Sequence, residues 1–175
     1  GVTAAIAAPA YAGIPLTHRG LSPSFTVVTG TEAPDKAESS VDWAALARTP
    51  GTLVVLMGWE SLPAITEALV RHGMSPDTPV ALIMWGTEPW QKTVTGVLRD
   101  VVDRARIADL SAPIVAVIGQ VVDLREKLRW FDNLPLFGKR VLVTRTRTQA
   151  GRLSQALAAS GALPVEVPTI DIERL

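Results

Sequence analysis

The sequence predicts an α/β fold, because apolar runs of strand length alternate with segments of helical spacing, and a glycine follows each run. The runs are continuous rather than interrupted by polar residues, which is typical of strands buried on both faces of a parallel sheet. They span residues 52–57, 79–85 and 114–118, and the glycines after them are Gly58, Gly86 and Gly119. Ligands of such layered folds usually lie at the carboxyl ends of the strands, so these three ends form the first candidate site.

A helix is predicted at the start of the chain. Thr3 is a suitable N-cap, because its hydroxyl can accept a hydrogen bond from a backbone N–H of the first turn, and the alanines after it have the highest helix propensity. Pro9 should kink or shorten this helix. Gly13 and Pro15 are typical of the residues that follow a helix end.

The segments between the apolar runs predict further elements. Residues 24–29 are rich in β-branched residues and should form a strand, whereas the polar residues 31–41 should form an exposed loop. Residues 93–98 form either another strand or a bend from a strand into a helix. Helical spacing predicts three more helices, at residues 61–73, 98–108 and 120–130.

A turn-rich connector at residues 133–138 divides the chain, and the pattern restarts after it. A strand and a helix are predicted at residues 140–144 and 147–160, and residues 163–172 should contain another short strand. One β-α-β unit is too small to bury a core alone. We therefore expect two parts, residues 1–133 and residues 134–175, the second being the truncated start of another α/β domain.

Length and composition narrow the class of protein. The 175 residues, 47% of them hydrophobic, suffice for one domain with a core, or for one domain and a piece of a second. The 17 basic and 17 acidic side chains cancel, so no general attraction to nucleic acid or to an anionic membrane is expected. No apolar stretch approaches the ~20 residues of a membrane-spanning helix. Because the chain opens on Gly1 without a signal-peptide pattern, we expect it to begin inside a longer protein.

Several kinds of site are excluded or disfavoured. The chain has no cysteine, which excludes a disulfide framework, a thiolate zinc site and a cysteine nucleophile, and which fits a cytoplasmic protein. The two histidines, His18 and His72, are far apart in the sequence, so we expect no metal site. His72 falls at a predicted helix end, where a cap is the expected role. The sequence contains neither a phosphate-binding glycine loop nor a serine-hydrolase elbow.

Two features have both a structural and a functional interpretation. Thr17-His18-Arg19 follows a Gly-Ile-Pro turn, and it is either a solvated surface loop or an anion-binding edge, since the planar guanidinium of Arg19 suits carboxylates. The strand-end glycines either tolerate a positive φ or let the backbone approach a flat ligand. Met57 is accordingly either a core residue or a soft apolar wall for that ligand.

Five stretches, taken in order, resemble the uroporphyrinogen-III C-methyltransferase family over about residues 1–133. They are GVTAAIAAPAYAGIPLTHR at 1–19, FTVVTG at 25–30, residues 52–58, residues 79–87, and VVDLREKL at 121–128 with Trp130-Phe131. The tail is similar to the start of the uroporphyrinogen-III synthases, through GKRVLVTR at 138–145, Gln149-Ala150, Leu157, Gly161 and Pro168-Thr169-Ile170. Fusion of the two activities in one chain is a known arrangement for this family.

The resemblance implies a fold, an activity and a cofactor. Residues 1–133 would be the C-terminal α/β domain of the tetrapyrrole methylase fold, which as a whole has two α/β domains with the cofactor between them. The parent protein would methylate uroporphyrinogen III with S-adenosylmethionine, forming precorrin-2 for sirohaem and cobalamin and releasing S-adenosylhomocysteine. A fused uroporphyrinogen-III synthase (lyase) activity and a homodimer are also implied.

The same resemblance assigns roles to single residues. Thr3, Ala4, Met57 and Gly86 match cofactor-binding positions, and Arg19 is a candidate for pairing with substrate carboxylates. These roles fit the chemistry, because methyl transfer is an in-line displacement that depends on positioning the donor and the acceptor. The substrate carries many carboxylates, which arginine binds well. No catalytic residue can be assigned, and no metal is required.

The sequence departs from the family pattern in one respect. The family's first domain carries a Gly-Pro-rich loop and a Gly-Gly-Asp segment, and neither occurs here. We therefore expect the 175-residue chain to show no turnover of either kind by itself. Two alternatives stay open: a methylase of a later precorrin, and a non-catalytic dimerisation module, for which the five tryptophans would supply apolar surface.

Overall fold

The computed structural model describes residues 1–30, 41–145 and 147–169. These residues form two compact units. The first comprises residues 1–87 and 91–129, and the second comprises residues 88–90 together with the chain from Trp130 onward. Most of the loop predicted at residues 31–41 lies outside the described residues.

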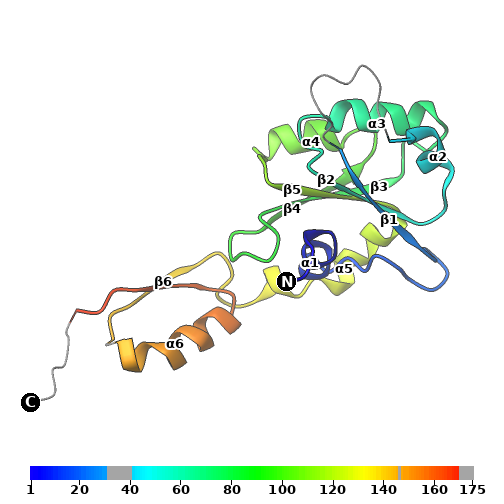
Figure 1. The fold of residues 1–175 in the computed structure, drawn as a ribbon. Coiled ribbons are helices and arrows are strands. Elements are labelled where there is room, and N and C mark those ends of the chain that lie inside the picture. The colour runs from blue at the N-terminus through cyan, green and yellow to red at the C-terminus, as the bar shows by residue number, and fades with distance from the viewer. Residues whose placement is uncertain (31–40, 146, 170–175) are drawn as a thin grey trace, which may run out of the picture. The chain divides into compact units, whose positions relative to one another are not determined.

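The first unit is built on a five-stranded mixed sheet (Figure 1). Its strands are β1 (Phe25–Thr29), β2 (Thr52–Leu56), β3 (Pro79–Met84), β4 (Lys92–Val97) and β5 (Ile114–Ile118). The order across the sheet is β1-β2-β5-β3-β4, with β1 and β2 parallel and every other neighbouring pair antiparallel. The α/β prediction is confirmed, and so is the strand interpretation of residues 93–98.

Helices cover both faces of this sheet (Figure 1). They are α1 (Ala4–Tyr11), α2 (Trp43–Arg48), α3 (Leu62–Arg71), α4 (Val101–Ile107) and α5 (Arg125–Leu128), and a 3₁₀ turn, η1 (Gln120–Leu124), precedes α5. The helices predicted at 61–73 and 98–108 are confirmed, whereas the one predicted at 120–130 is a 3₁₀ turn followed by a short α-helix. The sequence analysis missed α2.

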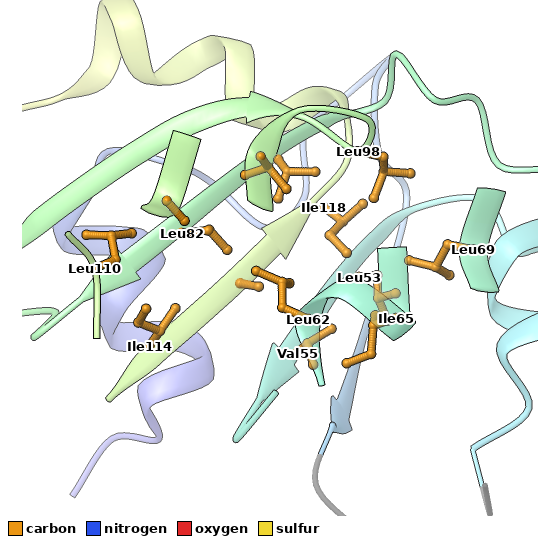
Figure 2. Packing of buried hydrophobic residues seen from close by; sticks show 14 residues of the cluster. Leu53, Val55, Leu62, Ile65, Leu69, Leu82, Leu98, Leu110, Ile114 and Ile118 are labelled. Atoms are coloured by element: carbon orange, nitrogen blue, oxygen red, sulfur yellow. The ribbon is translucent and has the colours of Figure 1, made fainter. Parts of the chain in front are cut away.

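The alternation of side chains along the strands divides the core into two layers. On one face, Leu53 and Val55 of β2 and Leu82 of β3 pack with the apolar side of α3, which presents Leu62 and Ile65 (Figure 2). On the other face, residues of the same strands pack with the small side chains of α1; this layer includes Ala5, Ala8, Ala12, Val54, Ala81, Ile83, Val115 and Val117. The alanines let α1 approach the sheet closely.

The direction of β5 corrects the expected position of Gly119. All five residues of β5 are buried, as the apolar run predicted, but the strand is antiparallel to both of its neighbours. Its carboxyl end therefore lies opposite the carboxyl ends of β2 and β3. Accordingly, the Gly119 N–H donates to the carbonyl of Pro79, the first residue of β3. The reason is that continuous hydrophobicity reports burial on two faces and carries no information on strand direction.

The first helix begins as predicted. Thr3 is its N-cap, and the Thr3 hydroxyl accepts a hydrogen bond from the Ala5 N–H at 3.3 Å. Pro9 lies inside the helix, which continues only to Tyr11. Gly13 follows with φ +72°, and a Cβ at Gly13 would lie 2.6 Å from the Cα of Arg129. Glycine is thus required there both by backbone conformation and by close packing.

The second unit contains the predicted β-α-β pattern. It consists of β6 (Arg140–Val143), α6 (Arg147–Ala159) and β7 (Leu163–Glu166), with β6 and β7 parallel. Phe131 and Phe137 pack edge to face in this unit with ring centroids 5.3 Å apart. The predicted assignment of residues 134–175 to a second enzyme family stays a prediction.

Asp100 connects the end of β4 to the start of α4. Its Oδ1 accepts the Val97 N–H at 2.8 Å, and its Oδ2 accepts from Nε of Arg104 at 2.7 Å. The Val97 hydrogen bond is the main reason that the pKa of Asp100 is lowered, and the hydrogen bond and charge of Arg104 add to this effect. Because the pKa is lower in the folded state, the carboxylate stabilises the fold above its unfolded pKa, and this stability is lost as pH falls through the folded pKa.

We predict that Asp100→Asn lowers the free energy of unfolding by about 1 kcal/mol or less at neutral pH, because a half-exposed charge-assisted contact is weakened. The difference in unfolding free energy between the two proteins should shrink as the pH falls below about 4, the pKa of an aspartate in the unfolded chain. Urea unfolding of both proteins at several pH values measures this difference. A deficit that stays constant with pH would contradict the role of the Asp100 charge.

Candidate functional site

The carboxyl ends of three strands meet at one edge of the first unit's sheet. Since β2 and β3 are each antiparallel to β5, they are parallel to each other, and β1 is parallel to β2. The residues that follow these strands are Gly30, Met57-Gly58 and Trp85-Gly86-Thr87. We call this row the carboxyl edge. It contains two of the three strand ends that the sequence analysis selected.

Backbone strain is concentrated at the carboxyl edge. Among the described residues, four non-glycine residues have a positive φ, and three of them lie here: Met57 at +50°, Trp85 at +50° and Thr87 at +78°. Such a conformation costs about 1–2 kcal/mol for an L-residue. Strained non-glycine residues cluster at ligand sites more often than elsewhere, so this edge is the strongest candidate for binding.

Met57 projects from the end of β2 and is 63% exposed. The structure therefore decides against the core interpretation of this residue. The next residue, Gly58, packs against Gly30, where a Cβ would lie 2.6 Å from the Cα of Gly58. The contact between these two glycines brings the ends of β1 and β2 together and leaves the Met57 thioether side chain exposed beside them.

Gly86 lies against the first helix. A Cβ built on Gly86 would be 2.4 Å from the Cβ of Ala8 and 3.0 Å from its Cα. The absence of a side chain at Gly86 therefore makes room for α1. Glycine is required here for packing, independently of any binding role of the Gly86 backbone. Trp85, the residue before it, is 44% exposed, so this edge presents an aromatic surface as well as the thioether of Met57.

Thr3 and Ala4 lie at the end of α1 nearest this edge. Ala8 contacts Gly86, whereas Ala12 at the other end of the helix accepts a hydrogen bond from Arg125 of α5. The N-terminal end of α1 therefore points to the side of the carboxyl edge. Thr3 and Ala4 are both exposed. The structure thus gathers Thr3, Ala4, Gly86 and Met57 along one edge.

Arg19 lies at the opposite edge of the sheet. It is exposed, and its carbonyl oxygen is 2.8 Å from Nδ1 of His18. The turn that carries it is fixed by Ser22, whose hydroxyl is 2.8 Å from the hydroxyl of Thr52, the first residue of β2. The amino end of β2 is the end away from Met57, so the structure does not bring Arg19 together with the other candidates.

Sequence reasoning missed Gln91, a polar residue buried beside the carboxyl edge. Its side chain is 5% exposed, and its Oε1 accepts the Thr87 N–H at 2.9 Å. Gln91 stands between Trp90 and Lys92 in a mixed polar stretch that is typical of a loop, so the sequence carries no signal of this burial. The signal is the strained backbone of Thr87, which only the structure reveals.

A wide hollow of about 780 Å³ lies elsewhere, beside β4 and α5, and several arginines line it. Its guanidinium groups serve the fold: Arg104 pairs with Asp100 at 2.7 Å, Arg99 pairs with Asp77, and Arg125 donates to the Ala12 carbonyl. Three acidic residues, Asp100, Asp123 and Glu126, line the hollow together with the arginines, so the net charge of its lining is small. We therefore place the candidate site at the carboxyl edge and not in this hollow.

Neither a metal-binding cluster nor a membrane-spanning helix occurs among the described residues. These residues contain no group of three or more histidine, aspartate or glutamate side chains that could hold a metal ion. Nor does any helix within them have the length and apolarity needed to cross a membrane.

The carboxyl edge suits a flat ligand with few charges. Exposed Met57 and Trp85 offer apolar and polarisable contact to a ligand. The Thr3 hydroxyl and the small side chain of Ala4 lie at the same edge and allow close approach.

Comparison with known proteins points to one family. The family model described as Tetrapyrrole (Corrin/Porphyrin) Methylases matches residues 1–102. The uroporphyrinogen-III C-methyltransferase of Bacillus subtilis is 37% identical over 168 residues, which are 96% of this chain and 35% of the relative. The S-adenosyl-L-methionine-dependent uroporphyrinogen III methyltransferase of Methanosarcina barkeri is 46% identical over 128 residues, 73% of this chain and 50% of the relative.

The fold comparison agrees. The structure of uroporphyrin-III C-methyl transferase from Thermus thermophilus, complexed with S-adenyl homocysteine, has a TM-score of 0.58 and 31% identity. The similarity covers 71% of this chain and 52% of that one. This chain therefore spans between about a third and a half of the length of the relatives described here.

We predict that Gly86→Ala destabilises the protein by about 1–3 kcal/mol, as overpacking of a filled site does. The cause is the clash with Ala8, so Ala8→Gly should relieve part of it. The double variant Ala8→Gly/Gly86→Ala should then lose less stability than the sum of the two single variants. Urea unfolding of all four proteins measures the coupling. Additive losses would show that α1 does not rest on Gly86.

Proposed function

This chain belongs to the tetrapyrrole methylase family, and we propose that it forms part of an S-adenosylmethionine-dependent uroporphyrinogen-III C-methyltransferase. The observation that carries this proposal is the strained and exposed carboxyl edge. The names of the relatives support it, because one is a methyltransferase dependent on S-adenosyl-L-methionine and a structural neighbour was solved with S-adenyl homocysteine. The protein would methylate uroporphyrinogen III to precorrin-2, within sirohaem biosynthesis.

The proposed roles at the carboxyl edge follow from the chemistry of each group. The cofactor supplies an electrophilic methyl group on a sulfonium. Met57, whose thioether is exposed, would form an apolar wall of the cofactor site, and the Thr3 hydroxyl and the backbone of Ala4 and Gly86 would provide polar contacts. Together these groups would orient the cofactor for an in-line displacement, whose main requirement is the positioning of donor and acceptor. No residue of this chain is assigned as an acid or a base.

Arg19 is proposed as a ligand for substrate carboxylates. Its guanidinium is exposed and suited to bidentate pairing. Because it lies at the edge away from Met57, its contribution should be independent of cofactor binding. The two candidate sites can therefore be separated by experiment.

Wider features of the parent protein belong to the same proposal. We infer that residues 134–175 begin a uroporphyrinogen-III synthase domain, and the similarity of the Bacillus subtilis relative over 96% of this chain supports a shared arrangement of the tail. We also propose that the protein is cytoplasmic, forms a homodimer and contributes to cobalamin as well as sirohaem. The β6-α6-β7 pattern is compatible with the start of an α/β domain.

We predict that the chain binds S-adenosylhomocysteine and that Met57→Ala weakens this binding about three- to tenfold, because the apolar wall is removed. Stability should change by less than about 0.5 kcal/mol, since the side chain is exposed. An NMR titration with S-adenosylhomocysteine measures the dissociation constant.

The matched control is Leu128→Ala, which also shortens an exposed apolar side chain, 47% exposed and located in α5. Its affinity for S-adenosylhomocysteine should equal that of the unmodified chain. If the Met57 variant and this control bind with equal affinity, Met57 is not part of the cofactor site.

We predict that Arg19→Ala weakens the binding of uroporphyrin III about tenfold, the loss expected for a charge-assisted hydrogen bond. The affinity for S-adenosylhomocysteine should not change. Quenching of porphyrin fluorescence measures the first quantity. Arg71→Ala is the control, because Arg71 is an exposed arginine that pairs with Glu67 on α3. If both variants lose porphyrin affinity equally, the effect is one of general charge, and the assignment of Arg19 is wrong.

A further inference from the structure

The turn after β3 is held in an unfavourable backbone conformation. Trp85 and Thr87 both have a positive φ, and they flank Gly86 on either side. The Trp85 N–H donates to the carbonyl of Pro113 at 3.3 Å, which continues the pairing of β3 with β5. Beyond this point the ladder ends, and the Thr87 N–H donates to a side chain, Oε1 of Gln91, at 2.9 Å. Gln91 therefore replaces the missing strand partner.

The orientation of the Gln91 amide is determined by this contact. A backbone N–H can be paired only with an acceptor, so Oε1 and not Nε2 must face Thr87. The amide nitrogen then points elsewhere, and it is buried with no hydrogen-bond partner in the described part of the protein. Flipping the amide would oppose two donors and would lose the existing bond as well. The unmatched donor is thus a fixed consequence of holding Thr87.

The other three fully buried polar residues of the described chain, Ser22, Thr52 and Thr66, are satisfied, whereas the buried Oγ1 of Thr93 on β4 also has no hydrogen-bond partner there. The hydroxyls of Ser22 and Thr52 pair with each other at 2.8 Å, and the hydroxyl of Thr66 donates to the Pro63 carbonyl at 2.9 Å. An unmatched buried donor costs about 1–3 kcal/mol. Residues 85–91 therefore include two residues with a strained backbone, Trp85 and Thr87, and one buried amide nitrogen without a hydrogen-bond partner, that of Gln91. Such local costs are typical of segments whose conformation serves a ligand.

We propose that Gln91 is a positioning residue for the cofactor: it locks the Trp85–Thr87 turn so that the backbone of Gly86 is presented in one conformation at the carboxyl edge. It acts through the Thr87 N–H and does not itself touch the cofactor. This inference rests on the proposed function, because it concerns the same turn. It adds to that function that the affinity of the carboxyl edge for the cofactor depends on a buried side chain, that of Gln91.

The test compares three variants of the whole chain. Gln91→Leu removes the acceptor and keeps a similar volume, whereas Gln91→Glu keeps an oxygen that can accept the Thr87 N–H. Thr66→Val is the control for stability alone, since it removes another buried hydrogen bond, on α3. Each protein is examined by amide hydrogen exchange at Thr87, by titration with S-adenosylhomocysteine and by thermal unfolding.

In Gln91→Leu, the Thr87 amide should exchange at least tenfold faster, and the affinity for S-adenosylhomocysteine should fall at least threefold. Gln91→Glu should restore most of the exchange protection and the affinity. Thr66→Val should lower the melting temperature without affecting either. A purely structural role would make the loss of affinity follow the melting temperature in all variants, which would overturn the proposal.

Two other results would also overturn it, and they are distinguishable. If Gln91→Leu leaves exchange at Thr87 unchanged, the side chain does not hold the turn. If exchange accelerates but the affinity is that of the unmodified chain, the turn does not serve the cofactor. Failure of the unmodified chain to bind S-adenosylhomocysteine would instead contradict the proposed function itself, and it would leave the Gln91–Thr87 bond as a contact of the fold alone.

Discussion

The contact between Gly86 and Ala8 is the constraint on which the arrangement of the site depends. A Cβ at Gly86 would lie 2.4 Å from that of Ala8, so only glycine lets α1 rest directly on the end of β3. This contact places the N-terminal end of α1, with Thr3 and Ala4, beside the turns that follow β2 and β3. Residues distant in sequence are thereby collected at one edge, and the conformation of the turn around Gly86 becomes part of the packing of the whole layer.

Strain and exposure occur together at this edge, which distinguishes it from the rest of the sheet. The interior of the first unit is formed by strands with continuous burial and by helices with a regular apolar side. At the carboxyl edge, by contrast, Met57 and Trp85 have left-handed backbones and exposed side chains. Such positions cost stability and bury little surface in return. A ligand that covers them would recover part of this cost, which is a physical reason to expect one.

Much of this fold could be predicted from the sequence, and the exceptions have physical causes. Strand positions followed from apolar runs, and the start of α1 followed from the capping hydroxyl of Thr3. The direction of β5 did not, because burial on two faces looks the same in either direction, and Gly119 was placed at the wrong edge. Gln91 was missed because its burial depends on a tertiary partner, the Thr87 N–H. For Arg19, the sequence identified a loop suited to anions, but not its separation from Met57 by the length of a strand.

We propose that the carboxyl edge is the cofactor-binding part of this methylase-family chain. An NMR titration of the ¹⁵N-labelled chain with S-adenosylhomocysteine tests it most directly, because every backbone amide reports separately. The account predicts that the largest shift changes fall on Ala4, Met57 and Gly86, while Arg19 at the opposite edge stays unaffected. Shift changes centred on Arg19 or on α5, with the carboxyl edge unchanged, would contradict it.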